Sequence, residues 1–303
     1  MTDPVVAVVM STYNGARHLP AMLASLAGQH RRPDRLVLRD DGSHDGSAAL
    51  VAQWAEREAV ALQRVAGPNL GAARSFLTAI AEAAPADITM LADQDDVWLP
   101  DKIARAVAHL APFPASTPAL YAARQHIVNE NLSPIRDSPL PRHLSINSAV
   151  CENVLTGCTM AFNRSLADLL RQGIPARVPM HDWWIYLLAA ATGTVLFDAQ
   201  PTMLYRQHGE NVIGAVPTGV AAGVARAKTL WRAPAQQRSD QLRALLHLHA
   251  GHLTPEARAL VEMLARARIS SRLRLRAGLG APIVRQSPRD TATTRAMILL
   301  NRF

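Results

Sequence analysis

Short apolar runs alternate with amphipathic segments through the first third of the chain. Buried strands are predicted at 5–10, 36–39, 61–65 and 88–92, because each run has strand length and is bounded by turn residues. Helices are predicted at about 20–29, 48–58 and 71–82, the first opened by Pro20, since proline is favoured in the first turn. This alternation indicates an α/β fold, with a mainly parallel sheet and helices on both faces.

The pattern becomes less regular after this region. In order, it predicts a strand pair near 120–128, a strand-like run at 155–162, a helix at 182–191, a strand at 194–197 and a polar loop at 205–214. After Pro217 the sequence turns helical and basic. We therefore expect an α/β domain over residues 1–217, followed by a helical, basic C-terminal extension over residues 218–303.

Three loops that follow predicted strands are unusually polar, namely 11–15, 40–47 and 93–96. Right-handed connections bring the carboxyl ends of parallel strands to one edge of the sheet, where ligands bind. In the third loop, Asp93 and Asp95 follow directly on an apolar run. Carboxylates this close repel one another unless a cation lies between them, and their oxygens suit Mg²⁺ or Mn²⁺. The pattern favours a metal site for a diphosphate, and the alternative is a solvated acidic loop.

Two further groups have chemistry suited to a nucleotide. Asp40 and Asp41 come directly after a strand, where carboxylates can bind the hydroxyl or imide groups of a nucleotide. The alternative is an Asx-turn that caps the next helix. Asn69 and Arg74 lie where a loop enters a helix, so that backbone amides and a guanidinium can face an anion. The alternative for Arg74 is an ordinary surface arginine.

Composition indicates a globular protein, and the charge is concentrated in its C-terminal part. The 303 residues are 49% hydrophobic, which is enough for one large core. Residues 221–303 hold 15 Lys and Arg against 4 Asp and Glu, whereas the rest of the chain is slightly acidic. In this tail arginines are interleaved with leucines over 264–279. Such a surface attracts anionic lipid headgroups or a lipid-diphosphate acceptor, and the alternative is a solvated face on a packed helix.

The remaining features argue against a nucleic-acid-binding protein, a disulfide-rich protein, a membrane-spanning protein and a secreted protein. No nucleic-acid-binding motif is present, so we expect no nucleic-acid partner. The two cysteines, Cys151 and Cys158, cannot build a disulfide framework, and no apolar run reaches the roughly 20 residues of a bilayer span. Asp3 precedes the first apolar run without a basic residue, which argues against a secretory signal. We expect a cytoplasmic protein, with the tail as a candidate for contact with the inner face of the plasma membrane.

In combination, the polar motifs resemble those of the family 2 glycosyltransferases, which have the GT-A fold. The motifs are Ser11-Thr12-Tyr13-Asn14-Gly15, Asp40-Asp41-Gly42-Ser43, Asn69-Leu70-Gly71 and Asp93-Gln94-Asp95-Asp96-Val97-Trp98-Leu99-Pro100-Asp101-Lys102. Three later motifs are more narrowly similar to the bacterial rhamnosyltransferase-type members, namely Gly157-Cys158-Thr159-Met160, His181-Asp182-Trp183-Trp184 and Tyr205-Arg206-Gln207-His208-Gly209-Glu210-Asn211. The resemblance covers about residues 5–215 and does not include the tail.

The resemblance implies an inverting, metal-dependent transfer from a nucleotide-diphosphate sugar. The metal ligands that it implies for Mg²⁺ or Mn²⁺ are Asp93, Asp95 and His208. Some candidate donor-binding residues come from the resemblance and others from the polar loops after the predicted strands. Together they are Thr12, Tyr13, Asp40, Asp41, Asn69, Arg74, Asp93 and Arg206. The implied donor is dTDP-rhamnose, with a UDP- or GDP-sugar as the alternative, and the acceptor is a cell-surface polysaccharide or a lipid-linked saccharide.

Asp182 falls where the family places its catalytic base, at the start of a helix whose positive end favours a carboxylate. The alternative is an N-cap aspartate ahead of an apolar helix. The usual glutamate before it is His181 here. The following Trp183 and Trp184 are candidates for the floor of an acceptor-sugar site, with core packing as the alternative for at least one. Two rival functions are a non-catalytic binding protein for nucleotide sugars or glycans and a membrane scaffold.

Overall fold

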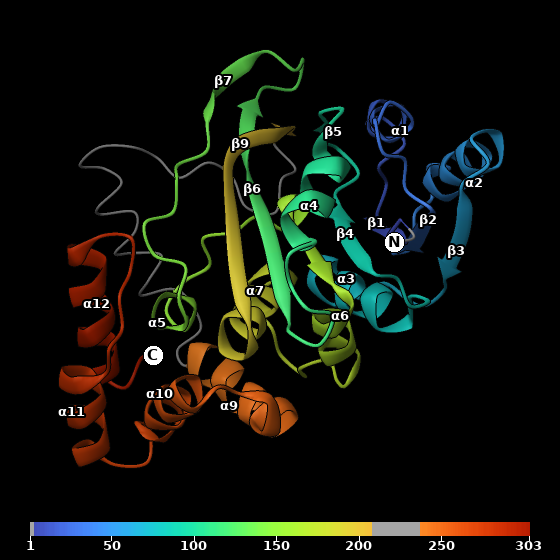
Figure 1. The fold of residues 1–303 in the computed structure, drawn as a ribbon. Helices are drawn as coiled ribbons and strands as arrows, with labels where there is room; N and C mark the ends of the chain where they lie inside the picture. Colours follow the sequence, from blue (N-terminus) through green and yellow to red (C-terminus); the bar gives the residue numbers. More distant parts are fainter. Residues whose placement is uncertain (1–2, 208–236) are drawn as a thin grey trace.

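The computed structural model describes residues 3–207 and 237–303, and its strands form one mixed sheet (Figure 1). The strands are β1 (Val6–Thr12), β2 (Arg35–Asp40), β3 (Ala61–Val65), β4 (Ile88–Ala92), β5 (Val97–Trp98), β6 (Ala119–Val128), β7 (Pro134–Asp137), β8 (Ala161–Asn163) and β9 (Thr194–Arg206). Their order in the sheet is β3-β2-β1-β4-β8-β6-β9-β5, and β7 pairs with β6.

The first four strands of the chain are parallel. β1 pairs with β2 on one side and with β4 on the other, and β3 continues beside β2. Beyond β4 the sheet is mixed: β8 runs antiparallel to both β4 and β6, β9 is parallel to β6, and β5 is antiparallel to β9. The carboxyl ends of β1, β2 and β4 therefore share one edge, which brings the loops that follow them together.

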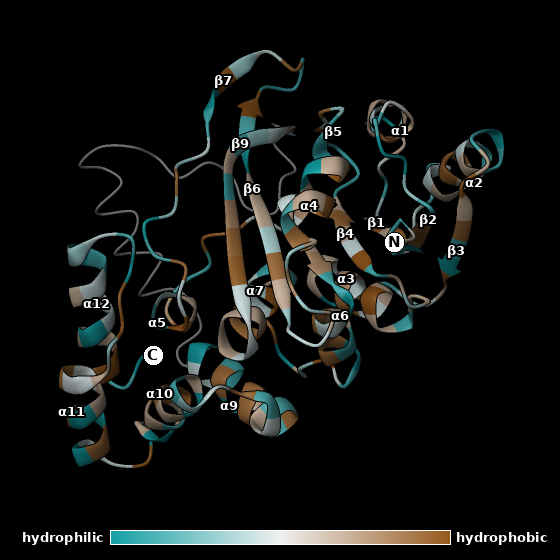
Figure 2. Cartoon of the chain, in the orientation of Figure 1, coloured by the Kyte–Doolittle hydropathy of each residue, from teal (hydrophilic) through white to brown (hydrophobic). Residues whose placement is uncertain are grey.

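Helices cover both faces of this sheet, and the last two described helices lie beside it (Figure 1). They are α1 (Leu19–Ala27), α2 (Ser47–Arg57), α3 (Ala72–Glu82), α4 (Lys102–Leu110), α5 (Ile146–Ala149), α6 (Arg164–Arg171), α7 (His181–Thr192), α9 (Gln237–His249), α10 (Pro255–Arg266), α11 (Ser271–Gly280) and α12 (Pro288–Leu299). Val9 of β1 lies in one core with Phe76 of α3, whereas the adjacent Val8 lies in the other with Leu23 of α1. Successive strand side chains point to opposite faces, so a strand covered on both sides is apolar throughout. Figure 2 shows hydrophobic residues along the central strands.

The C-terminal helices share a core with the sheet. Leu245 of α9, Leu264 of α10 and Ile298 of α12 belong to the same buried cluster as Trp184 of α7. The expected boundary between residues 217 and 218 lies outside the described residues. Within the two described ranges, no helix combines the length and the apolar character that a bilayer span needs.

The expected elements of the first hundred residues are confirmed to within about three residues. The strand-like run at 155–162 is wrong over most of its length, because Gly157–Thr159 forms a 3-10 turn and the paired strand β8 begins only at Ala161. The strand expected at 194–197 extends to Arg206. Three helices, α4, α5 and α6, are not expected from the pattern.

Gly193 joins α7 to β9 at a point of close approach and gives a test of this packing. A Cβ atom there would lie 1.9 Å from the carbonyl oxygen of Pro118, which accepts a hydrogen bond of 2.9 Å from Thr194 N. Gly193→Ala should lower the free energy of unfolding by about 1–3 kcal/mol, because β9 must shift against β6. Urea denaturation measures this. Gly251→Ala is the matched control, since nothing lies within 4 Å of its new Cβ atom; equal losses in both would contradict the account.

Candidate active site

The loops that follow β1, β2 and β4 meet at one edge of the sheet, as the sequence predicts. Thr12 Oγ1 donates a hydrogen bond of 2.9 Å to Asp40 Oδ1. Tyr13 N donates to Gln94 Oε1 at 2.9 Å, and Gln94 Nε2 donates back to the Tyr13 carbonyl at 3.1 Å. These bonds fix the loop after β1 between the other two and leave the Tyr13 side chain exposed.

Asp40 is a partly exposed carboxylate at this edge. Its Oδ2 accepts a hydrogen bond of 2.9 Å from Ser43 N, and its Oδ1 accepts one of 2.5 Å from Ser43 Oγ. Burial opposes ionisation, but the bonds from Ser43 and Thr12 together outweigh it and lower the pKa of Asp40. Asp40 therefore carries a full negative charge at neutral pH.

Asp41 differs from Asp40 because its carboxylate is buried and occupied by the chain itself. It accepts hydrogen bonds from Leu70 N (2.9 Å) and Gly71 N (2.8 Å), and it pairs with the buried guanidinium of Arg39. Asn69 Nδ2 donates to the Asp41 carbonyl at 2.7 Å. This network ties the end of β2 to the loop that enters α3.

The two arginines singled out from the sequence contact backbone carbonyls. Arg74 is exposed, and its Nη1 donates to the Ala176 carbonyl at 3.2 Å, in the segment before α7. Arg206, at the end of β9, donates from Nε to the Asp95 carbonyl at 2.8 Å and from its guanidinium to the Glu130 carbonyl. Arg206 thus joins the loop after β4 to the turn between β6 and β7. His208 lies outside the described residues.

A cavity of 360 Å³ lies beside Arg206. It is lined by Arg17, His18, Ala21, Glu130, Asn131, Leu132 and Arg206, and an ion pair of 2.5 Å joins Arg17 to Glu130. None of the acidic residues that follow β4 lines this cavity, so we assign it no part in the chemistry of the site.

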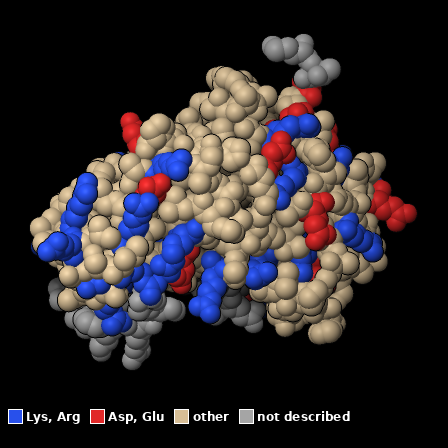
Figure 3. Space-filling view, turned by 90° about the horizontal axis from the view of Figure 1, so that it is seen from below, with Lys and Arg blue, Asp and Glu red and all other residues tan. Residues whose placement is uncertain are grey.

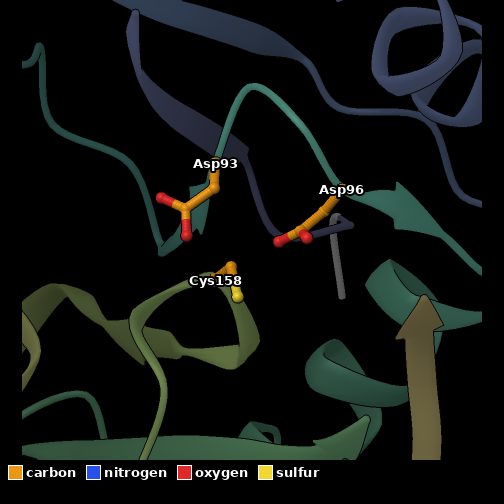
Figure 4. Close-up of side chains that lie close together, drawn as sticks. All are labelled: Asp93, Asp96 and Cys158. Atoms are coloured by element: carbon orange, nitrogen blue, oxygen red, sulfur yellow. The ribbon is translucent and has the colours of Figure 1, made fainter. Parts of the chain in front are cut away.

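Acidic side chains from distant parts of the chain gather at the end of β4. Asp93 and Asp96 point toward Cys158 (Figure 4), and one ligand atom from each of the three lies within 4.8 Å of the others. Asp96 is fully buried, and its Oδ2 has no hydrogen-bond partner among the described residues. Burial, followed by the negative charges of Asp95 and Asp182, raises the pKa of Asp93 to about 7. Carboxylates that oppose one another's ionisation in this way form a site that a cation stabilises.

The donor atoms suit a hard divalent cation. The free oxygen of Asp96 and the carboxylate of Asp93 are ligands that Mg²⁺ and Mn²⁺ prefer. Burial raises the pKa of the Cys158 thiol well above its ordinary value, so the sulfur is a neutral thiol rather than a thiolate ligand. Lys102 is fully buried nearby, and burial lowers its pKa to about 8. At neutral pH it is mostly charged and offsets part of the carboxylate charge.

Asp182 lies in the first turn of α7 and is buried. Its Oδ1 accepts a hydrogen bond of 2.7 Å from Trp183 N. Burial raises the pKa of Asp182 to about 6, and hydrogen bonds from Trp183, Asn153 and the Gly157 backbone limit the rise. A carboxyl group of this pKa is mostly ionised at neutral pH and still basic enough to accept a proton, as a general base requires.

His181 packs inside the protein beside Asp182. Its ring stacks on Phe76 with the centroids 4.2 Å apart, and burial lowers its pKa to about 3. A Cβ atom at Gly157 would lie 2.5 Å from His181 Nε2, so a glycine is needed where the turn that carries Cys158 closes on this ring. His181 is therefore a neutral packing residue that positions this turn.

The two tryptophans after Asp182 have different surroundings. Trp184 is fully buried in the core, which confirms the expectation that at least one packs there. Trp183 is only partly buried, and its Nε1 donates to the Ala149 carbonyl at 2.7 Å. The guanidinium of Arg238, from α9, lies 5.6 Å from the Trp183 ring centroid. The C-terminal helices therefore contact the residue next to Asp182.

Three residues of this site were not among the candidates from the sequence, namely Asp96, Cys158 and Lys102. All three belong to the quoted motifs. No spacing rule connects Cys158 with Asp93, because they meet only through the pairing of β8 with β4. Each of Asp96 and Lys102 is followed by an apolar residue but preceded by an aspartate, so the local sequence gives no clear signal of their burial.

Comparisons with known proteins match this chain to one protein family and to solved structures that share its fold. The model of the family "Glycosyl transferase family 2" matches residues 7–169. The dTDP-rhamnosyl transferase RfbG of Shigella flexneri is 25% identical over 218 residues, which cover 68% of this chain and 74% of RfbG. PcManGT and TarS, two solved structures that match, have low sequence identity and show the fold alone.

The mannosyltransferase PcManGT from Pyrobaculum calidifontis, solved in complex with GDP-Man and Mn²⁺, matches with a TM-score of 0.54 and 22% identity, over 99% of this chain and 75% of PcManGT. S. aureus TarS 1–349 in complex with UDP-GlcNAc matches with a TM-score of 0.56 and 13% identity, over 99% of this chain and 93% of TarS. The chain therefore has the GT-A fold that the sequence motifs predict.

The ion pair between Arg39 and Asp41 can be tested by removing one partner. Arg39→Met should lower the free energy of unfolding by about 3–5 kcal/mol, because it leaves a buried carboxylate without its counter-charge. Urea denaturation gives this value. Arg64→Met, at an exposed position of β3, should change it by less than about 0.5 kcal/mol. If the two variants were equally stable, the pair would not be what joins β2 to α3.

Proposed function

The chain belongs to glycosyl transferase family 2 and is a glycosyltransferase, and we propose that it moves a sugar from a nucleotide-diphosphate donor to a saccharide acceptor with inversion at the anomeric carbon. One observation carries the proposal. The partly exposed carboxylate of Asp40, the carboxylates after β4 and the buried carboxylate of Asp182 all belong to segments that meet around one edge of the sheet.

We assign the nucleotide to the loops after β1 and β2. The carboxylate of Asp40 is ionised and partly exposed, and the Tyr13 ring beside it is free to contact a base. Thr12 holds Asp40 in place through its hydroxyl group. Asp41 and Asn69 shape the loop through the network that they form with each other. Arg74 and Arg206 are proposed to act on the diphosphate, Arg206 through the loop that it holds.

We assign the divalent cation to the carboxylates after β4. Asp93 and Asp95 are the proposed ligands, His208 is a further candidate from the sequence alone, and Asp96 adds a buried oxygen with no partner among the described residues. PcManGT was solved with Mn²⁺, and the oxygen donors here suit Mn²⁺ or Mg²⁺. When bound, such a cation neutralises charge on the departing diphosphate.

Asp182 is the proposed general base. Its carboxylate takes the proton from the acceptor hydroxyl as that oxygen forms a bond to the anomeric carbon. The bond from the anomeric carbon to the diphosphate oxygen breaks, and its electron pair leaves with the nucleoside diphosphate. The helix start at Asp182 and the bonds from Trp183 and Gly157 hold the carboxylate in one orientation.

For the donor we propose dTDP-rhamnose. The support is the name of the relative RfbG together with the motifs around Cys158, Asp182 and Arg206. PcManGT and TarS were solved with GDP-Man and UDP-GlcNAc, so sugars of these nucleotides are the alternative donors. The proposed acceptor is a cell-surface polysaccharide or a lipid-linked saccharide.

A donor screen tests the reaction and its metal requirement together. Purified protein is incubated with dTDP-, UDP- and GDP-sugars and Mg²⁺ or Mn²⁺, and free nucleoside diphosphate is measured. We expect the fastest release from dTDP-rhamnose and none after chelation of the metal. Asp93→Asn should reduce release at least about 100-fold, whereas Asp168→Asn, at an exposed position of α6, should not. Metal-independent release, or none from any donor, would refute the proposal.

The role of Asp182 has its own test. Asp182→Asn should lower kcat by about 10²–10⁴-fold with unchanged donor affinity, because only the proton acceptor is lost. For the unmodified protein, kcat/KM should fall about tenfold per pH unit below the pKa of about 6, since the protonated carboxyl group cannot act as a base. Asp168→Asn is again the control. Undiminished transfer by Asp182→Asn, or a rate that stays constant well below this pKa, would remove the assignment.

A further inference from the structure

The helix α11 turns two of its three leucines, Leu275 and Leu279, away from the protein. It lies with α12 at the edge of the molecule (Figure 1), and its buried residues are Ala277 and Gly278. Gly278 packs so closely on Leu299 of α12 that a Cβ atom would lie 2.6 Å from its Cδ2. Leu275 and Leu279 are 54% and 68% exposed. A surface helix usually buries its large apolar residues, whereas α11 buries its smallest ones.

These leucines share one stripe of α11 with two arginines. Arg272, Leu275, Arg276 and Leu279 follow the spacing i, i+3, i+4, i+7, which places them on one side of a helix. Both arginines are exposed. Among the described ranges, neither forms an ion pair, in contrast with Arg266, which pairs with Glu262 at 3.6 Å. We call this stripe of four residues the α11 face.

The surroundings of the α11 face are strongly basic. Between Glu262 and Asp290 the chain has seven arginines and no acidic residue. Figure 3 shows arginine side chains gathered over the half of the molecule formed by the C-terminal helices. A partner that binds the α11 face must therefore carry negative charge and also offer an apolar environment for the leucines. Leu299, 39% exposed beside Gly278, adds to the apolar surface.

We propose that the α11 face docks this protein on an anionic lipid bilayer. In this arrangement Leu275 and Leu279 enter the headgroup region, and Arg272 and Arg276 pair with lipid phosphates. A second copy of the chain fits the face poorly, because a two-fold contact would oppose the same arginines to one another. The proposal concerns a surface remote in sequence from the transfer chemistry and does not depend on the donor.

Vesicle sedimentation with the full chain tests the proposal. Phosphatidylcholine vesicles with phosphatidylglycerol should carry the protein down, and vesicles of phosphatidylcholine alone should leave it in solution. Binding should weaken as salt is raised, because the charge attraction is screened. Absence of binding to the anionic vesicles would overturn the proposal.

Paired variants locate the binding surface. Leu275→Ser with Leu279→Ser, and Arg272→Gln with Arg276→Gln, should each weaken binding at least about tenfold. The apolar control is Ile135→Ser with Leu140→Ser, whose exposure of 53% and 51% is comparable, and the charge control is Arg136→Gln with Arg142→Gln, at exposed positions.

Nucleoside diphosphate release in solution should be unchanged in the α11 variants, which shows that they are folded and separates this result from the proposed transfer. Equal losses in the α11 variants and the controls would overturn the proposal. So would a concentration-dependent dimer that Leu275→Ser abolishes while vesicle binding persists.

Discussion

Repulsion among buried carboxylates is the constraint on which the arrangement of this site depends. Asp93 is partly buried beside Asp95, Asp96 and Asp182, and its raised pKa records the cost of ionising it there. The surrounding elements offset this cost. Strand β9 supplies Arg206, whose backbone N–H donates to Asp96 and whose side chain holds the loop by its carbonyl. Helix α4 supplies a buried ammonium group. The fold thus brings several carboxylates close together, an arrangement whose oxygen atoms suit a divalent cation.

The adjacent residues Asp40 and Asp41 carry the same carboxylate group but differ in role, because one faces the site and the other is buried. Asp40 is the last residue of β2 and Asp41 follows it, so their side chains face different sides of the strand. Asp40 keeps a partly exposed carboxylate that hydroxyl groups hold in place. Asp41 turns inward to Arg39 and to the amides before α3, where it joins two loops. The sequence motif contains both aspartates, but only the tertiary contacts tell which of them remains available to a ligand.

The sequence predicts those elements whose formation depends on neighbouring residues in the chain. The strands and helices up to β4 follow from apolar run length and period, and the parallel topology then brings their loops together. The turn at Gly157–Thr159 could not be predicted, because it packs closely on the His181 ring, which is distant in the chain. For the same reason the position of Cys158 beside Asp93 was missed. Contacts made across an antiparallel pair late in the chain leave no periodic signal in the sequence.

The C-terminal helices pack into the core and also carry the proposed membrane-docking surface, so the two roles have to be tested by substitution at chosen positions rather than by deletion. Their inner sides complete the core around Trp184 and place Arg238 over Trp183, next to Asp182. Removal of the whole extension would expose that core and free the start of α7, so any loss of membrane binding would be confounded with loss of folding. The α11 face is different, because the buried side of that helix consists of Ala277 and Gly278. Its exposed leucines and arginines contribute little to the core, so substitutions there can change binding to a surface while the fold is retained.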